Sequence, residues 1–307
     1  MKGIMVVDQV DNRELAYKQP MQLSTRQKIL KYYEEAGPDY QTWSPSYNMH
    51  FGYFHWGMNP FSREKMLDRM NLEIFRSMDI SKDQSALIGD MGCGLGATAR
   101  YIAKHFPAMS LKGITLVPWQ VDQGTRLARE SGLDGRVKIV EGDYTSTPFE
   151  DNSLDGVYAV ESGCYAGGAS KEDLIREMAR VLKPGKKMVM ADGFVKTEKM
   201  TGWTASIYQK LCSCWALKEL GHIDKVREAL LRHGFTDIRI RDASWRVAPS
   251  VAHVPFTVLW FLVKRMFSSN GIMTKERWNN LMAPMLTMFL GLSRRNFSYY
   301  IISARKM

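Results

Sequence analysis

The chain has 307 residues, of which 45% are hydrophobic, so it can bury one large core or one core with a smaller cap. Lys and Arg total 42 against 32 Asp and Glu, and the net charge of +10 favours an acidic partner, such as a phosphorylated substrate or an anionic membrane surface. The basic residues are dispersed without a long Lys/Arg block. We therefore expect no nucleic-acid partner and at most peripheral membrane contact.

Cysteine usage and hydropathy bear on the compartment. The four cysteines show no paired framework, and the sequence has neither a signal peptide nor a run of about 20 apolar residues. These features predict a cytoplasmic protein. They leave open whether the chain forms a homodimer.

The first 78 residues are predicted to form an N-terminal arm, helices and an aromatic lid. Residues 1 to about 24 show little periodicity, which is typical of a loosely docked arm. Apolar spacing then predicts helices on either side of the loop 47–57, which holds five aromatic residues in eleven positions. The loop is interpreted either as a hydrophobic staple onto the core or as an aromatic cage that stabilises a positive charge.

The segment Leu87–Gly96 carries the strongest motif. Two apolar residues lead into Asp90 and then into glycines at every second position, a pattern typical of a buried parallel strand that turns into a helix beside a ligand. The spacing differs from the G-x-G-x-x-G of dinucleotide sites. A carboxylate at this point suits a cationic amino group and would repel a pyrophosphate.

Three further segments follow at the spacing of an alternating β and α chain: Gly113–Gln120, Glu141–Tyr144 and Arg180–Gly185. The alternation from about residue 85 to 242 predicts a parallel sheet with right-handed crossovers. Polar residues then fall at the carboxyl ends of predicted strands, where open α/β sheets bind ligands.

Together these segments resemble the motifs of class I S-adenosylmethionine-dependent methyltransferases, over about residues 47–242. G-I-T-L-x-x-x-Q at Gly113–Gln120 and V-E-S at Val160–Ser162 resemble the sterol, tocopherol and prenyl-diphosphate C-methyltransferase branch. Most class I enzymes have an acidic residue where this chain has Thr115, and Gln120 replaces it as the ribose ligand. The resemblance implies these cofactor-binding residues: Tyr47, Asp90, Gly92, Cys93, Gly94, Thr115, Leu116, Gln120, Asp143, Tyr144 and Val160.

The resemblance also implies the architecture, a doubly wound, seven-stranded Rossmann-like α/β sheet with a mainly helical cap. Residues 79–199 would form the S-adenosylmethionine-binding core, 200–222 a helical cap insertion, and 223–307 the rest of the core with a helical insertion at the substrate pocket. The apolar stretch 254–267 is too short to span a bilayer. Residues 297–303 are expected to form an antiparallel strand at the edge of the sheet.

The expected reaction is C-methylation of an isoprenoid alkene. When an alkene takes up a methyl group, a carbocation is left on the adjacent carbon, so the pocket must be dry, rich in aromatic rings and supplied with one base. By resemblance Glu161 is that base, although a helix cap or an ion pair would also explain a carboxylate there. Tyr53 and Trp56 are the expected cage, and His50 is a candidate that would otherwise be a hydrogen-bonded structural histidine.

The substrate expected from the resemblance is a prenyl diphosphate, farnesyl or geranyl diphosphate, with basic side chains and Mg²⁺ as candidates to neutralise the diphosphate. No metal site made by the protein is predicted. N- or O-methylation of a hydrophobic small molecule is the alternative within the same branch. A non-catalytic S-adenosylmethionine-binding protein is the third hypothesis, because fold alone does not imply function.

Overall fold

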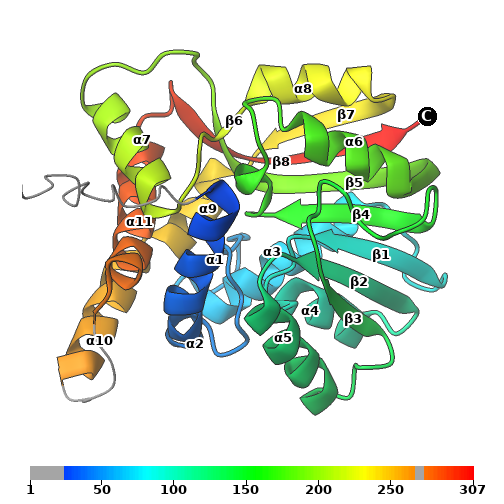
Figure 1. Cartoon of the computed structure of the whole chain (residues 1–307), viewed down its shortest axis with the longest axis horizontal. Helices are drawn as coiled ribbons and strands as arrows, with labels where there is room; N and C mark the ends of the chain where they lie inside the picture. The colour runs from blue at the N-terminus through cyan, green and yellow to red at the C-terminus, as the bar shows by residue number, and fades with distance from the viewer. Residues whose placement is uncertain (1–23, 267–272) are drawn as a thin grey trace, which may run out of the picture.

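The computed structural model describes residues 24–266 and 273–307, so the arm expected over residues 1–24 lies almost wholly outside the described residues. A twisted sheet forms the centre, with helices on both of its faces and a group of helices beyond one end (Figure 1). The predicted α/β fold is confirmed.

Seven strands pair in the order β3-β2-β1-β4-β5-β8-β7, and a two-residue strand, β6, pairs with the end of β5. Every pairing is parallel except those of β8. The strands are β1 Ala86–Met91, β2 Met109–Thr115, β3 Val137–Glu141, β4 Leu154–Val160, β5 Leu182–Val195, β6 Gly221–His222, β7 Phe235–Asp242 and β8 Phe297–Lys306.

The C-terminal strand β8 is antiparallel as predicted, but it does not lie at the edge. It pairs with β5 along one side and with β7 along the other, so β7 is the edge strand. Residues 297–303 are apolar or small without a polar alternation, and nearly all of β8 is buried. A continuous run of apolar and small residues is typical of a strand whose two faces are both covered, as for a strand in the interior of a sheet.

The helices that cover the sheet bury apolar side chains on its two faces. On one face α6 (Glu172–Val181) and α8 (Ile223–Arg232) contribute to a core with residues of β4 and β5. The other face carries α3 (Arg63–Ser77), α4 (Ala97–His105), α5 (Pro118–Glu130) and α9 (Ser244–Val251).

The remaining helices gather beyond the carboxyl ends of the parallel strands, at the left of Figure 1. The first of them, α1, begins at Ser24, whose side chain accepts from the Gln27 N–H while the Gln27 side chain accepts from the Ser24 N–H, a capping box. These elements are α1 Thr25–Ala36, η1 Gly37–Asp39, α2 Tyr40–Trp43, η2 Gly163–Tyr165, α7 Gly202–Cys214, α10 Val254–Met266 and α11 Lys275–Leu292.

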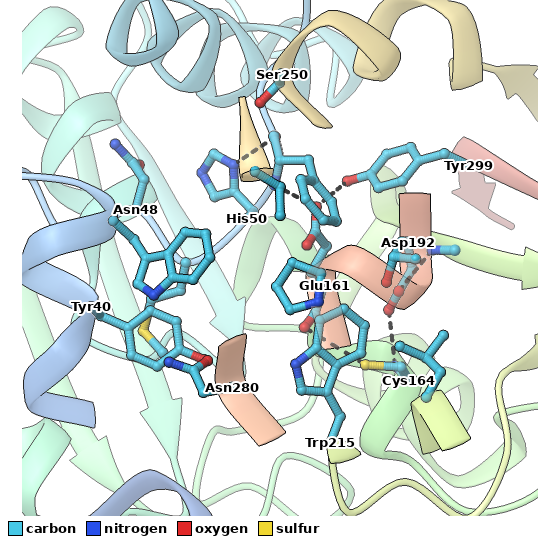
Figure 2. Close-up of a pocket in the computed structure, with 18 of the residues that line it drawn as sticks. Tyr40, Asn48, His50, Glu161, Cys164, Asp192, Trp215, Ser250, Asn280 and Tyr299 are labelled. Carbon is cyan, nitrogen blue, oxygen red and sulfur yellow. Dashed lines mark hydrogen bonds between the residues drawn. The ribbon is translucent and has the colours of Figure 1, made fainter. Parts of the chain in front are cut away.

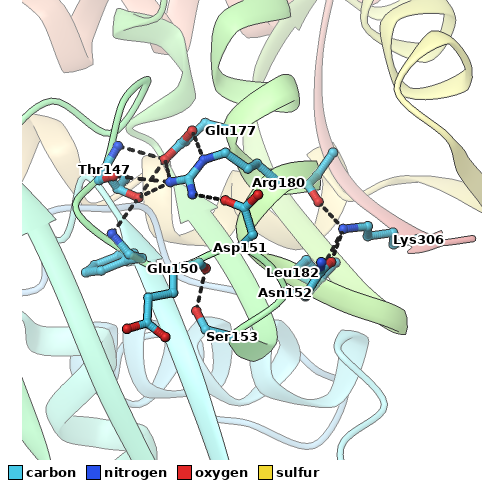
Figure 3. A network of polar contacts seen from close by, with 11 residues as sticks. Thr147, Glu150, Asp151, Asn152, Ser153, Glu177, Arg180, Leu182 and Lys306 are labelled. Atoms are coloured by element: carbon cyan, nitrogen blue, oxygen red, sulfur yellow. Dashed lines mark hydrogen bonds and ion pairs between the residues drawn. The ribbon is translucent and has the colours of Figure 1, made fainter.

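At the end of the sheet opposite the group of helices, a polar network surrounds Arg180 at the end of α6 (Figure 3). Its guanidinium donates to Glu177 and Asp151, and Glu177 also accepts from the backbone N–H and hydroxyl of Thr147. Lys306, at the end of β8, donates to the Ala179 and Leu182 carbonyls. The network fixes the loop between β3 and β4 far from the ligand edge, so its role is structural.

Candidate active site

Two cavities adjoin each other above the carboxyl ends of the strands. The first, here the glycine-turn cavity, surrounds the turn after β1, and the second, here the aromatic cavity, lies under α2, α7, α10 and α11. A shared set of residues lines both, so it marks where a group could pass from one ligand to the other: Tyr33, Met49, His50, Glu161 and Tyr165.

The glycine turn brings backbone against the first cavity. Gly92 has a φ of +81°, and a Cβ built there would lie 2.5 Å from the Cβ of Ser162. Ser162 in turn donates its hydroxyl to the Met91 carbonyl at 2.5 Å, which joins the loop after β4 to the loop after β1. Only glycine satisfies both the left-handed backbone and the close approach.

Asp90 is the last residue but one of β1, and its carboxylate is buried beside this cavity. Tyr158 donates its hydroxyl to Asp90 Oδ2 at 2.8 Å, and no described cation pairs with the carboxylate. Burial raises the pKa of Asp90 to about 7, and the hydrogen bond from Tyr158 only partly opposes it. A buried carboxyl group with a raised pKa suits the cationic amino group of S-adenosylmethionine. The positive charge of the amino group would favour the ionised form of Asp90.

Thr115 and Gln120 meet at the carboxyl end of β2. The Thr115 hydroxyl donates to Gln120 Oε1 at 2.6 Å, and both side chains are buried beside the glycine-turn cavity. This bond occupies the amide oxygen of Gln120 and leaves its NH₂ group to donate. Thr115 therefore orients the side chain that the resemblance assigns to the ribose.

Ten of the eleven cofactor residues expected from the sequence line the glycine-turn cavity. The exception is Asp143, which is exposed and whose Oδ1 accepts from the backbone N–H and hydroxyl of Thr145. Its adenine-binding role stays a prediction. The sequence analysis missed further lining residues, Ile29, Tyr33, Ala97, Thr98, Val117, Ser162 and Tyr165, of which Ile29 and Tyr33 come from α1 and carry no motif.

The aromatic cavity is lined mainly by aromatic and apolar side chains with a few polar groups, as small-molecule sites commonly are. Figure 2 shows two carboxyl groups, Glu161 and Asp192, among rings contributed by separate elements. The aromatic lining residues are Tyr33, Tyr40, Trp43, Phe51, Tyr165, Trp215, Phe297 and Tyr299.

Glu161 follows β4 and has a φ of +48°, a backbone conformation that is uncommon for a residue with a Cβ. Its Oε1 accepts from the Phe51 N–H at 2.7 Å and from the Tyr299 hydroxyl at 2.9 Å, whereas Oε2 has no hydrogen-bond partner among the described residues. Burial raises the pKa of Glu161 to about 8. Neither an ion pair nor a helix cap accounts for this carboxyl group.

Asp192, in β5, is the second carboxyl group of the aromatic cavity. It accepts from the Cys164 N–H at 2.9 Å and from the Gly193 N–H at 2.8 Å. Burial raises its pKa to about 6, which is less than for Glu161 because these two backbone donors stabilise the ionised form. Asp192 thus holds the loop that carries Glu161 and adds negative charge to the cavity.

His50 lines both cavities, but both of its ring nitrogens are engaged. Nδ1 lies 3.0 Å from the Phe51 carbonyl and Nε2 lies 2.9 Å from Asn71 Oδ1. Burial lowers the pKa of His50, so the ring is neutral at neutral pH. This arrangement matches the structural histidine weighed for it above.

The structure places neither Tyr53 nor Trp56 in the lining of the glycine-turn cavity or the aromatic cavity. Tyr53 is buried beneath Arg241 and Arg246, whose guanidinium carbons lie 5.4 and 6.0 Å from its ring centroid. Trp56 is 76% exposed at the tip of its loop. The rings that do line the aromatic cavity come instead from α1, α2, η2, β8 and the end of α7, and Phe51 is the one aromatic of the loop among them.

The aromatic cavity contains little positive charge. Arg63 is the one Lys or Arg among its described lining residues, and its guanidinium already donates to the Trp43 carbonyl. The part of the chain that the structure describes holds no group of three or more His, Cys, Asp or Glu placed to bind a metal ion. A neutral or cationic reacting group suits this lining better than an anion.

The chain is similar in sequence to known methyltransferases. Residues 88–185 match a methyltransferase domain. The 24-methylenesterol C-methyltransferase 2 of Arabidopsis thaliana is 30% identical over 186 residues, which cover 60% of this chain and 49% of that enzyme. The chloroplastic tocopherol O-methyltransferase of the same plant is 28% identical over 242 residues, or 73% of this chain and 67% of that enzyme.

A solved structure supports the fold. The geranyl diphosphate C-methyltransferase of Streptomyces coelicolor, with Mg²⁺, geranyl diphosphate and S-adenosyl-L-homocysteine, superposes with a TM-score of 0.69 at 18% identity, over 93% of this chain and 98% of that one. The identity is low, so this likeness concerns the fold alone.

Proposed function

We propose that this chain, which is an S-adenosylmethionine-dependent methyltransferase, methylates a carbon of an isoprenoid alkene and uses Glu161 to remove the proton that the product loses. The observation that carries the proposal is the position of Glu161. It lies on the boundary of the two cavities, half-buried among rings, with one carboxylate oxygen free of hydrogen bonds from described residues.

The glycine-turn cavity suits the methyl donor. S-adenosylmethionine supplies an electrophilic methyl group when bound, and Asp90, Gly92 and Gln120 would hold its amino acid and ribose portions. The alkene π electrons form the new C–C bond, and one carbon of the former double bond is left with a positive charge.

The aromatic cavity has the properties that such a cation needs. Rings stabilise a nearby cation by about 0.5 to 2 kcal/mol each, and the mostly apolar lining disfavours water beside it. Glu161 then accepts a proton from a neighbouring carbon, and the C–H electrons restore a double bond. Because the pKa of Glu161 is raised to about 8, we expect turnover to rise with pH through this value as the carboxyl group ionises.

Among isoprenoids, a prenyl diphosphate such as geranyl or farnesyl diphosphate is the specific substrate to test first. The net charge of +10 and the named activity of the structural neighbour favour it. The lining of the aromatic cavity does not suit the diphosphate group of such a substrate. Among the described lining residues, Arg63 is the one Lys or Arg, and two carboxyl groups line the same cavity. We therefore place the hydrocarbon in this cavity and the diphosphate, with any Mg²⁺, outside it.

O-methylation of a hydrophobic phenol is the second candidate, and the similarity to tocopherol O-methyltransferase favours it. In that reaction Glu161 would accept the phenolic proton and no carbocation would form. The rings would then affect substrate affinity more than the chemical step.

The test is transfer of a labelled methyl group to a panel of geranyl and farnesyl diphosphate, each with and without Mg²⁺, a sterol, a tocopherol and a hydrophobic amine. We expect the label on carbon of an isoprenoid. Label found only on oxygen or nitrogen would overturn the proposal in favour of the second candidate, and mass spectrometry of the product separates the two.

A further inference from the structure

Large apolar side chains gather on a surface that neither cavity uses. Seven of them, here the apolar patch, are between 61% and 84% exposed. Large apolar side chains exposed together on neighbouring segments are more often an interaction site than single exposed residues are. The members of the apolar patch are Trp56, Phe61, Trp245, Phe256, Leu259, Trp260 and Met266.

The patch comes from two segments that the structure joins. Backbone hydrogen bonds link the loop to α9, since the Phe54 N–H donates to the Arg246 carbonyl at 2.7 Å. A second link lies at the start of α10, where His253 Nε2 is 2.8 Å from the Pro60 carbonyl. Trp56 and Phe61 are therefore carried beside the exposed residues of α9 and α10.

Helix α10 is two-sided. Val254 and Phe261 are buried in a small core with Trp43 and Leu281, whereas Phe256, Leu259 and Trp260 face away from it. The buried and exposed positions recur at helical spacing, and both faces are apolar, so the outer face of α10 presents apolar side chains to its surroundings.

The two segments that carry the patch have no acidic residue. Residues 47–63 and 243–266 contain no Asp or Glu, while Arg246, Lys264 and Arg265 are basic. The acidic residues that flank these segments are engaged, Asp242 by Arg294 and Glu64 by Ser44. Apolar rings bordered by cations are complementary to an anionic phospholipid surface.

The alternative of a membrane span fits the structure less well. Residues 244–266 are long and apolar enough to cross a bilayer by length and composition. However, the helix is interrupted between α9 and α10, and Ser250 and Val254 line the aromatic cavity from its inner side. Removing this segment into a bilayer would open the cavity, so it can lie on a membrane but not cross it.

We propose that the apolar patch docks this protein on the surface of an anionic phospholipid bilayer. The rings insert at the level of the headgroups, and Lys264 with its basic neighbours binds the lipid phosphates. Because α9 and α10 also form a wall of the aromatic cavity, docking places that wall against lipid, where apolar isoprenoids dissolve. The docking itself requires no substrate and does not depend on the proposed reaction.

The test is cosedimentation of the full chain with vesicles of phosphatidylcholine, alone or mixed with phosphatidylglycerol. We expect binding to the mixed vesicles that is released by high salt or alkaline carbonate. The double variant Phe256→Ser and Trp260→Ser should weaken it at least about tenfold, and Lys264→Gln about fivefold, from the ~1 kcal/mol that one basic residue contributes near such a surface.

Trp203→Ser is the matched control, because Trp203 is also exposed but lies on α7. It should bind vesicles like the unchanged chain, and all variants should keep the affinity for S-adenosylhomocysteine, which shows that they fold. Three results would overturn the proposal: no binding to mixed vesicles, binding unaffected by the double variant, or resistance to carbonate extraction. A dimer in solution that the double variant converts to a monomer, without vesicle binding, would instead assign the patch to a second copy.

Discussion

The two cavities share five residues but are built in different ways. The glycine-turn cavity is made largely by consecutive residues at strand ends, and backbone contributes much of its wall, as at Gly92, Gly94 and Leu116. The aromatic cavity is made by side chains from elements as far apart as α1, α7 and β8. The glycine-turn cavity therefore depends on the sheet and its strand ends, whereas the aromatic cavity depends on how the helices of the cap pack together.

The largest effect is expected where the backbone lines the glycine-turn cavity. Gly92→Val should abolish binding of S-adenosylhomocysteine, because a Cβ at this position meets Ser162 and its φ is positive. Calorimetric titration measures the affinity. The control Gly135→Val, at an exposed glycine with open space around it and no positive φ, should bind normally, and equal loss in both variants would contradict the argument.

The next effect concerns the boundary between the cavities. Glu161→Gln keeps the shape and the hydrogen bonds from Phe51 and Tyr299 but cannot accept a proton. Turnover at saturating substrate should fall about 10²-fold or more, while the affinity for S-adenosylhomocysteine stays nearly the same. Single-turnover rates measure the first and titration the second. An unchanged rate would remove Glu161 as the base.

Among the described residues, Asp90 is the one buried carboxylate that lines the glycine-turn cavity and not the aromatic cavity. Asp90→Asn should weaken S-adenosylhomocysteine binding by about 1.5 to 3 kcal/mol, the usual contribution of a hydrogen bond to a charged group. Asp192→Asn is the control, since Asp192 lines the aromatic cavity alone and should leave this affinity unchanged. Similar losses in the two variants would show that the cavities are not separable in this way.

The raised pKa of Asp90 predicts that the binding of S-adenosylhomocysteine depends on pH. Because burial raises it to about 7 in the free protein, the carboxyl group is mostly protonated at pH 6 and must lose its proton to bind an ammonium group. Affinity for S-adenosylhomocysteine should therefore fall as pH drops below 7, by up to about tenfold per pH unit. Titration in the Asp90→Asn variant should lose this dependence, and a flat profile in the unchanged chain would contradict the assignment.

The smallest effect separates the rings of the aromatic cavity from those of the loop. Trp43→Ala should slow turnover, because Trp43 lines that cavity, whereas Trp56→Ala should change it by less than about twofold, because Trp56 lies outside both cavities. Turnover is measured without vesicles, so that any docking role of Trp56 does not enter. Equal slowing in both variants would restore the cage first expected from the loop.

Much of the fold could be predicted because its signals are local. The strand, Asp90 and the glycines after it are consecutive in sequence, and parallel strands in series bring their carboxyl ends to one edge. For β8 the resemblance to the methyltransferase fold predicted the antiparallel direction, but the place of this strand between β5 and β7 depends on partners far away in sequence.

The sequence by itself determined most of the lining of the glycine-turn cavity, because short motifs at strand ends specify both the backbone path and the side chains that face this cavity. Only the tertiary structure decided which rings line the aromatic cavity. The loop at residues 47–57 carries the densest aromatic signal, yet its Tyr53 is covered by two arginines and its Trp56 faces outward. A residue type states which contacts a side chain can make, whereas the packing of distant helices decides which contacts it does make.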